Sequence, residues 1–354
     1  MAILTFPNVG ISAMAAAIPK RVIDNYRYGT DTWPADEIRK VVDKIGIRER
    51  RFVDDGTCSS DLCFAAAERL IADNHIDRSE IDLLIFVSPT PDFKMPPSSL
   101  LLQDRLGLSK STMAFDVSMV CSAYPYGLSL AYSLMQQHTM RKALLLVGDT
   151  PSKVYSPHDR RSAYIFGDAG TASLIECGEQ FGTSHFSINS DGSRGDYIKI
   201  PAGGYRMPSS VETLQERVID DYGNRRSDEQ GYMLGDDVFN FVISEIPDDI
   251  KALFSHTGEN LQEMDYYVFH QANAFMNNYL AKKLRLEKEK VLSCIEKFGN
   301  TSSASVPLTI VNHFANQSII ENKKFMLCAF GVGMTWATAI IPITRCNISP
   351  IIEL

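Results

Sequence analysis

The stretch FDVSMVCSAYPYGLSLA, from Phe115 to Ala131, decides the fold of this chain. It opens in a short apolar run, Met113–Val117, that is typical of a buried strand, and beyond Cys121 its apolar residues recur at helical spacing. We therefore expect Cys121 to lie where a strand turns into a helix. Unpaired N–H groups and the helix dipole favour negative charge there, which predicts a lowered pKa for the thiol. The alternative is a small apolar core cysteine, a common fate of free Cys.

Strands and helices alternate around this stretch. Ile81–Thr90 and Lys142–Asp149 are continuous apolar runs, as in strands that are buried on both faces. Amphipathic helices are predicted over 61–73 and 100–106. Turn glycines at the start of Phe166–Glu176 lead into a further strand. Strands that alternate with helices predict parallel pairing and an α/β fold.

The second half of the sequence echoes the first. Three segments repeat the pattern of earlier ones in the same order: 264–273 follows 81–90, 290–314 follows 114–134, and 323–333 follows 142–149. The offset of about 180 residues is too long for a solenoid repeat and indicates a duplicated domain. The predicted halves are residues 1–180, which carry the cysteine, and 181–354.

A long polar excursion separates the two halves. Ala202–Leu234 contains four glycines and few apolar anchors. Loops of this length are uncommon inside compact domains unless they cover a site or are disordered. The sequence leaves open whether this segment closes over a pocket or lies in solvent.

Composition limits the classes of function. The chain has 354 residues, of which 45% are hydrophobic, and a formal charge of −8, which argues against nucleic-acid binding. No run approaches the roughly 20 apolar residues of a membrane span. The first 20 residues lack a basic n-region and predict an opening strand rather than a signal peptide. We therefore expect a cytoplasmic protein with neither a membrane nor a nucleic-acid partner.

The cysteines suit neither a disulfide framework nor a metal site. Their number is odd, seven, and their spacing is irregular. No CxxC pair occurs, which argues against a zinc knuckle and against a redox pair. The sequence therefore predicts no bound metal.

Two residues of the second half could act with Cys121. His270 ends an apolar strand, at the sheet edge where open α/β sheets bind ligands. Asn300 lies in FGNTSSASVP, on a loop ahead of a small-residue helix start. Each signal alone also fits a structural histidine or turn chemistry with a helix cap. Duplicated halves would bring all three residues into one cleft, and together they are the ingredients of thiolate catalysis.

Four ordered motifs carry a resemblance to a known family. DVSMVCSAYPYGLSLA, VFHQANAFMNNYLAKKL, FGNTSSASVPLTI and AFGVGMTWATAII resemble those of β-ketoacyl-acyl-carrier-protein synthase III, among the thiolase-fold condensing enzymes. GIRERR, DRRSAYIFGDAGTA and the final strand also match in order, so that the resemblance covers nearly the whole chain. It implies a thiolase-like fold, with duplicated βαβαβαββ halves in five αβαβα layers, and a homodimer.

The resemblance also implies a chemistry. Cys121 would take an acyl group from a coenzyme A or carrier-protein thioester, with no permanently bound cofactor. A malonyl group on acyl carrier protein would then lose carbon dioxide, and its enolate would attack the acyl-cysteine. His270 and Asn300 would donate hydrogen bonds to the enolate oxygen. The backbone N–H groups of Cys121 and Val332 would form the oxyanion hole.

The donor-binding residues depart from the family pattern. The usual Gly-Gly-Gly-Phe loop reads Gly-Val-Gly-Met from Gly331, and Val332 keeps its N–H in place only if its φ is negative. Lys40 and Lys44 stand where a Trp and an Arg bind the adenine of coenzyme A. Arg160 matches the other arginine of that clamp.

The acyl pocket is expected to be formed by Phe166, Ala272 and Phe330, with Met95 at the position of an aromatic residue inserted by the partner subunit. Met is flexible and could admit a larger acyl group. The helix after HQAN carries Phe275 at the usual basic carrier-docking position. These departures predict an acyl donor other than acetyl-coenzyme A, in a specialised pathway.

Two rival functions stay open at this point. The same fold could use Cys121 to transfer an acyl group to an oxygen or nitrogen nucleophile without decarboxylation. The chain could also be an inactive partner of a heterodimeric condensing enzyme. Retention of His270 and Asn300 favours condensation, because an acyltransferase needs no enolate clamp.

Overall fold

The fold repeats one strand order twice. The computed structural model describes residues 2–137 and 139–354. In the first half the order is β6-β5-β7-β8-β2, with β5 parallel to β6 and β7, and β8 antiparallel to β7 and β2. These strands are β2 (Val9–Ile18), β5 (Ile81–Val87), β6 (Met113–Val117), β7 (Lys142–Asp149) and β8 (Ala169–Cys177).

The second half has the order β15-β14-β16-β17-β9 with the same directions. Its strands are β9 (Ser184–Ser190), β14 (Tyr266–Phe269), β15 (Val291–Leu292), β16 (Ile319–Gly331) and β17 (Thr335–Ile348). This repetition confirms the predicted duplicated fold. The first strand of the chain, β1 (Ala2–Phe6), pairs with β9 of the second half. The domain boundary at residue 180 stays a prediction.

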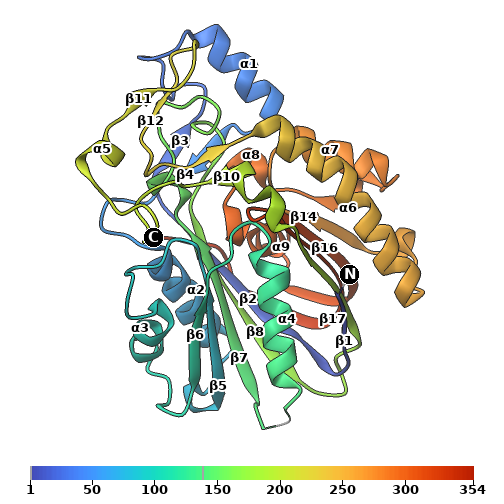
Figure 1. Cartoon of the computed structure of the whole chain (residues 1–354). Helices are drawn as coiled ribbons and strands as arrows, with labels where there is room; N and C mark the ends of the chain where they lie inside the picture. The colour runs from blue at the N-terminus through green and yellow to red at the C-terminus, as the bar shows by residue number, and fades with distance from the viewer. Residues whose placement is uncertain (1, 138) are drawn as a thin grey trace.

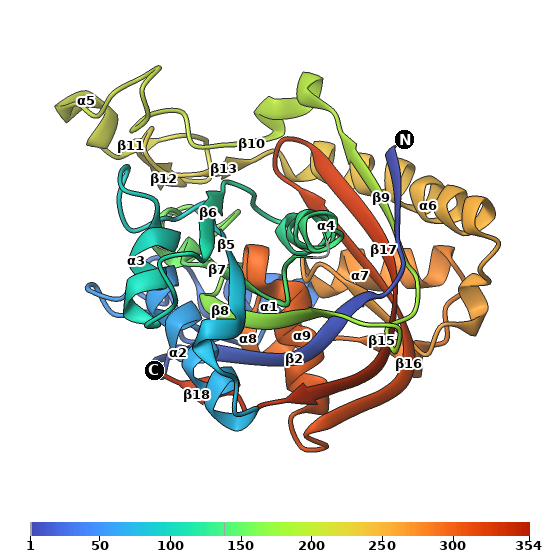
Figure 2. The ribbon, with the colours of Figure 1, turned by 90° about the horizontal axis from the view of Figure 1, so that it is seen from below.

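Helices and sheets form five layers (Figures 1 and 2). Three apolar cores separate the layers: one between the outer helices and the first sheet, one around the two central helices between the sheets, and one beneath the helices outside the second sheet. The helices, in that order, are α2 (Ser59–Asp73) and α3 (Ser98–Arg105), α4 (Ala123–Met135) and α9 (Ser305–Phe314), and α6 (Gly235–Thr257) and α7 (Ala274–Lys283).

Burial explains why the central strands are apolar throughout. All but one of the residues of β5 are buried, because helices cover both faces of its sheet. At the top of the molecule in Figure 1, α1 (Ala35–Ile45) buries Ile38 and Val42 and exposes its basic side chains, which form a solvated helix face. The short elements nearby are β3 (Val22–Asp24), β4 (Glu49–Arg51) and α8 (Ile295–Phe298).

The excursion between the halves folds back onto the molecule. It contains α5 (Val211–Leu214) and two ribbons, in which β10 (Ile198–Lys199) pairs with β13 (Tyr232–Met233) and β11 (Arg217–Val218) with β12 (Arg225–Arg226). The last strand, β18 (Ile352–Glu353), pairs with β2. Among the described residues, no helix combines the length and apolar character of a membrane span.

Candidate active site

One mainly apolar cleft is lined by residues of both halves. Cys121, His270 and Asn300 all line it, as do four further residues predicted for the pocket or the oxyanion hole. Those four are Phe166, Ala272, Phe330 and Val332. The cleft therefore gathers the predicted reacting residues from segments that are far apart in the sequence.

Cys121 lies just before α4 and against the end of β16. Its side chain is buried, and a Cβ on Gly331 would lie 2.5 Å from the Cβ and 2.6 Å from the Sγ of Cys121. Only glycine lets this backbone approach the sulfur so closely. The backbone of the next residue, Val332, acts to lower the pKa of the thiol, and this residue is not among those with positive φ.

The expected low pKa of Cys121 is wrong. Burial raises the pKa of this thiol to about 11, and the nearby Asp149 carboxylate acts in the same direction. The backbone of Val332 and of Cys121 itself and the Ser302 side chain lower the pKa, but they only partly oppose this effect. Loss of water around the sulfur outweighs the helix terminus, so Cys121 rests as a thiol at neutral pH.

His270 rests neutral. It follows β14, and its backbone N–H donates to the carbonyl oxygen of Cys328 at 2.8 Å. Burial lowers the pKa of the imidazole to about 3. Its Nδ1 lies 2.7 Å from Ser305 Oγ, and the edge-on ring of Phe330 fixes its plane at 5.7 Å between centroids. When Ser305 donates to Nδ1, the ring proton lies on Nε2, and the neutral imidazole is a hydrogen-bond donor.

Asn300 is held by backbone contacts. Its N–H donates to Ile165 O at 2.9 Å, and its carbonyl oxygen accepts from Gly167 N at 3.0 Å. Its side-chain Oδ1 accepts from the N–H of Ser302 at 2.8 Å, which leaves the amide group Nδ2 as a donor. Gly299, at φ +65°, permits this turn, since a Cβ there would lie 2.7 Å from Ile165 O.

The predicted donor-binding residues lie apart from the cleft lining. Lys40 and Lys44 are exposed on α1, and the guanidinium of Arg160 pairs with Glu37 of the same helix. Met95 is 76% exposed and does not line the cleft of this chain. The roles of these four residues stay predictions.

Sequence reasoning missed several residues of the cleft. Asp149, Tyr155 and Ser302 line it, and so do residues next to the excursion such as Ile198 and Val238. Asp149 ends β7 at the carboxyl end of a strand, the position that His270 has after β14 in the other half, and this position was the available signal. Burial raises the pKa of Asp149 to about 7.

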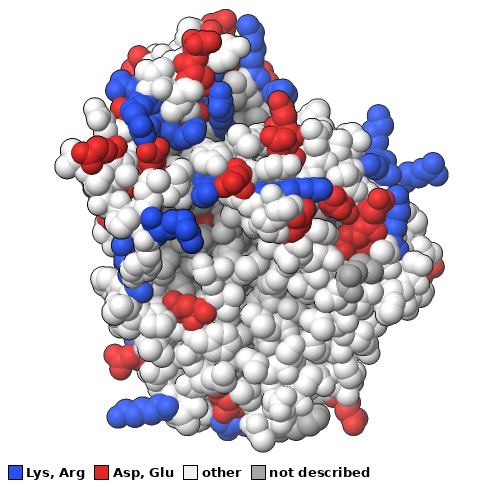
Figure 3. All heavy atoms as spheres, viewed as in Figure 1, with Lys and Arg blue, Asp and Glu red and all other residues white. Residues whose placement is uncertain are grey.

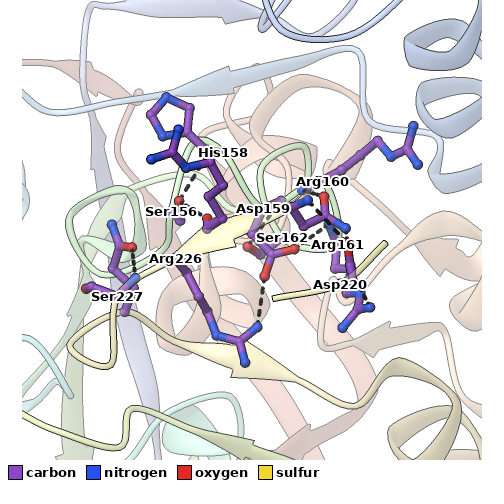
Figure 4. Close-up of polar contacts among 12 residues, drawn as sticks. Ser156, His158, Asp159, Arg160, Arg161, Ser162, Asp220, Arg226 and Ser227 are labelled. Carbon is purple, nitrogen blue, oxygen red and sulfur yellow. Dashed lines mark hydrogen bonds and ion pairs between the residues drawn. The ribbon is translucent and has the colours of Figure 1, made fainter. Parts of the chain in front are cut away.

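A polar network ties the excursion to the loop that carries Arg160 (Figure 4). Ser156 Oγ donates to Arg225 O at 2.8 Å, and Arg226 pairs with the buried Asp159 at 3.2 Å. Arg161 pairs with Asp220 at 2.6 Å. The excursion therefore packs beside the cleft rather than lying free in solvent.

Charged side chains gather over α1 and the excursion on the face seen in Figure 3, whereas its lower part is mostly uncharged. No group of three or more His, Cys, Asp or Glu among residues 2–137 and 139–354 is arranged to hold a metal ion.

Comparisons with known proteins agree with this geometry. Residues 115–192 match the family model "3-Oxoacyl-[acyl-carrier-protein (ACP)] synthase III", and residues 254–343 match the model of its C-terminal part. A putative 3-oxoacyl-[acyl-carrier-protein] synthase 3 of Campylobacter jejuni is 32% identical over 95% of this chain and 94% of its own length. A β-ketoacyl-[acyl-carrier-protein] synthase III of Clostridioides difficile is 30% identical over 94% and 97%.

Among solved structures, a 3-oxoacyl-(acyl-carrier protein) synthase from Burkholderia xenovorans superposes with a TM-score of 0.92 at 34% identity, over 100% of this chain and 99% of the other. The family models, the superposition and relatives aligned along almost the full length lead to one conclusion. The chain belongs to the 3-oxoacyl-[acyl-carrier-protein] synthase III family.

Proposed function

We propose that this protein condenses an acyl thioester with malonyl-acyl carrier protein, with loss of carbon dioxide, to give a β-ketoacyl thioester. The observation that carries the proposal is the meeting of Cys121, His270 and Asn300 in one apolar cleft. The sulfur supplies a nucleophile, and the two nitrogen groups supply hydrogen-bond donors. An apolar lining suits an acyl chain.

In the first stage Cys121 attacks the acyl thioester. Negative charge develops on the carbonyl oxygen, and the N–H groups of Cys121 and Val332 are the proposed donors to it. The backbones of both residues lower the pKa of the thiol, so they already favour negative charge at this place, which supports the role. The donor thiol leaves and an acyl-Cys121 thioester remains.

In the second stage the malonyl thioester loses carbon dioxide, and the bonding electrons form an enolate. The Nε2–H of His270 and the Nδ2–H of Asn300 would stabilise its oxygen. The enolate carbon then attacks the acyl carbon, and Cys121 leaves as a thiolate. Because the pKa of its imidazolium form is lowered to about 3, His270 is neutral at working pH and offers its N–H as a hydrogen-bond donor to the developing charge.

Coenzyme A or a carrier protein presents the acyl donor in this proposal. Arg160, Lys40 and Lys44 remain the candidate contacts for the adenine nucleotide. Acyl carrier protein is the proposed macromolecular partner. All seven cysteines are free, which supports a reducing compartment such as the cytoplasm.

A homodimer is part of the proposal. Strand β6 ends its sheet, so one edge has unpaired backbone groups that can pair with a second chain. Met113 on this strand is 46% exposed, and few charges lie on the lower part of the face in Figure 3. Light scattering after size-exclusion chromatography should give twice the chain mass of 39.5 kDa. A monomer would remove Met95 from any role in a partner's pocket.

The function is tested with thioester donors of several chain lengths and malonyl-acyl carrier protein. Intact-protein mass spectrometry should detect acyl-Cys121, and radiolabelled carbon dioxide should appear together with a β-ketoacyl product. Cys121→Ala should abolish both the acyl-enzyme and the β-ketoacyl product. An ester or amide product without carbon dioxide would support the rival transferase, and a wild-type protein that stays unacylated would contradict the proposal.

A further inference from the structure

We propose that Asp149 accepts the Cys121 proton through the hydroxyl of Ser302 while Cys121 is being acylated. This inference rests on the proposed function, and it assigns a role to a buried carboxyl group that the condensation steps above do not use.

Asp149 is placed for such a role by the sheet. It is the last residue of β7, it is only 2% exposed, and it lines the same cleft as Cys121. Thr90 Oγ1 donates a hydrogen bond to Asp149 Oδ1 at 2.8 Å, which fixes the carboxyl group. The carboxylate is close enough to Cys121 to raise the pKa of the thiol.

Ser302 lines the same cleft as Cys121 and Asp149. Its hydroxyl acts on both Cys121 and Asp149 and lowers the pKa of each. The side chain is 2% exposed, and its Oγ makes no hydrogen bond of standard geometry within the described part of the chain. Ser302 also has a φ of 50°, a conformation that is uncommon outside glycine and concentrates at functional sites. The hydroxyl is therefore free to turn between sulfur and carboxylate.

In the roles proposed above, none of the three reacting residues acts as a base toward the Cys121 thiol. Cys121 is a thiol at neutral pH and must lose its proton during attack. The tautomer of His270 that donates to an enolate has no lone pair on Nε2. Asn300 is a donor only on its nitrogen. The Asp149 carboxylate is the base that we assign to this step.

The proton transfer balances. As sulfur attacks the thioester carbon, the Cys121 proton passes to Ser302 Oγ and the Ser302 proton passes to Asp149. The tetrahedral intermediate then expels the donor thiolate. The Asp149 proton returns through Ser302 to that thiolate, which leaves as a thiol, and both residues regain their starting states.

The surrounding groups place the titration of Asp149 in the neutral range. Asp168, at the start of β8, and Tyr155, beside the cleft, face the same region, and the Asp168 charge raises the pKa of Asp149. The pKa of Asp149 is about 7, that of Asp168 about 6, and those of His270 and Cys121 about 3 and 11. The carboxylate form is the base, so acylation should become faster as pH rises through about 7.

The test uses octanoyl-N-acetylcysteamine, a donor that needs neither coenzyme A nor carrier-protein recognition. The rate of Cys121 acylation is followed by mass spectrometry from pH 5.5 to 9 in the wild type, Asp149→Asn and Ser302→Ala. The wild-type rate should rise with a midpoint near pH 7. Both variants should lose this rise, and Asp149→Asn should be about 100-fold slower at pH 8, the size of a general-base contribution.

Thr90→Val supplies a matched control that keeps the carboxylate. Loss of the Thr90 hydrogen bond should move the midpoint to higher pH, which a purely structural defect would not do. An Asp149→Asn protein with the wild-type rate and midpoint would overturn the inference and leave the proposed function intact. A wild-type protein that is not acylated at Cys121 would overturn both.

Discussion

Cys121 and His270 are both uncharged at rest, because the same burial raises the pKa of the thiol and lowers that of the imidazole. A thiolate–imidazolium pair is therefore absent from the resting site that the structure describes. The site instead offers hydrogen-bond donors to charge that develops on the substrate. This arrangement stabilises a transition state without binding a permanent ion.

His270→Ala should slow decarboxylation much more than acylation. Loss of one such donor costs about 2.7–4 kcal/mol, or about 10²–10³-fold in rate. The two stages are measured separately, as carbon dioxide release from malonyl-acyl carrier protein and as octanoyl transfer to Cys121. His256→Ala, on the exposed side of α6, is the control and should change neither. Equal losses in both stages would contradict the role given to His270.

Gly331→Ala should block acylation. The added Cβ would lie 2.6 Å from Cys121 Sγ, so either the sulfur or the loop must move, at a cost of about 1–3 kcal/mol for overpacking. The acylation rate with octanoyl-N-acetylcysteamine should fall by at least about tenfold. Gly192→Ala is the control, because an added Cβ there meets nothing within 4 Å. A wild-type acylation rate in Gly331→Ala would show that the loop can move away from the sulfur without slowing acylation.

At the scale of elements, the excursion and the loop at 154–162 act as one unit. The buried Asp159 is the centre of their contact, since it accepts from Arg161 N at 3.1 Å and pairs with Arg226 at 3.2 Å. The ribbon β10–β13 extends this unit to the cleft, where Ile198 and Met233 are part of the lining. The excursion thus shapes one wall of the candidate site.

Asp159→Ala should loosen this unit. It leaves a guanidinium and a backbone N–H without their acceptor, a loss of about 1–3 kcal/mol. Hydrogen exchange over 203–231 should become faster by about tenfold, the factor that about 1.4 kcal/mol represents. Asp228→Asn, which removes the exposed pair with Arg217, should have little effect, as exposed pairs contribute about 0–1 kcal/mol. Equal hydrogen-exchange rates in the two variants would show that Asp159 does not hold the excursion against the loop at 154–162.

The sequence predicted these elements unevenly. The strands at 81–90 and 142–149 were confirmed because burial on both faces gives a continuous apolar run. The fate of the excursion could not be predicted, since its contacts are ion pairs with residues about 60 positions away, and such pairs have no local periodicity. The pKa of Cys121 was missed for a related reason, because its burial depends on Gly331 and Val332, more than 200 residues later.

For the whole molecule, duplication explains why a cleft forms at all. Each half presents the carboxyl ends of its parallel strands at one edge, and the shared core around α4 and α9 fixes the two edges against each other. Burying these strand ends also buries carboxyl groups, whose ionisation then becomes less favourable. Asp149 and Asp168 are both almost fully buried, and each lies where ionisation is opposed by loss of water.

These two carboxyl groups should make the folded protein less stable as pH rises above about 4. Burial raises their pKa values from 3.8 to about 7 and about 6, so between these limits the native state holds more protons than the unfolded state. The unfolding free energy therefore falls with rising pH, for Asp149 by at most about 4 kcal/mol between pH 4 and 8. His270 acts in the opposite sense. Below about pH 6.5 its imidazole binds a proton in the unfolded state but not in the native state, so the unfolding free energy falls as pH falls.

Urea unfolding of the wild type and Asp149→Asn at pH 5.5 and 8 measures the Asp149 contribution. The difference in unfolding free energy between the two pH values should be smaller in the variant, because an amide has no ionisation to suppress. Asp248→Asn, at an exposed site on α6, should leave that difference unchanged. If the pH dependence of Asp149→Asn equals that of the wild type, Asp149 ionises as freely in the fold as in water. It would then be fully ionised well below pH 7, and the proposed rise in acylation rate near pH 7 would have no titrating group behind it.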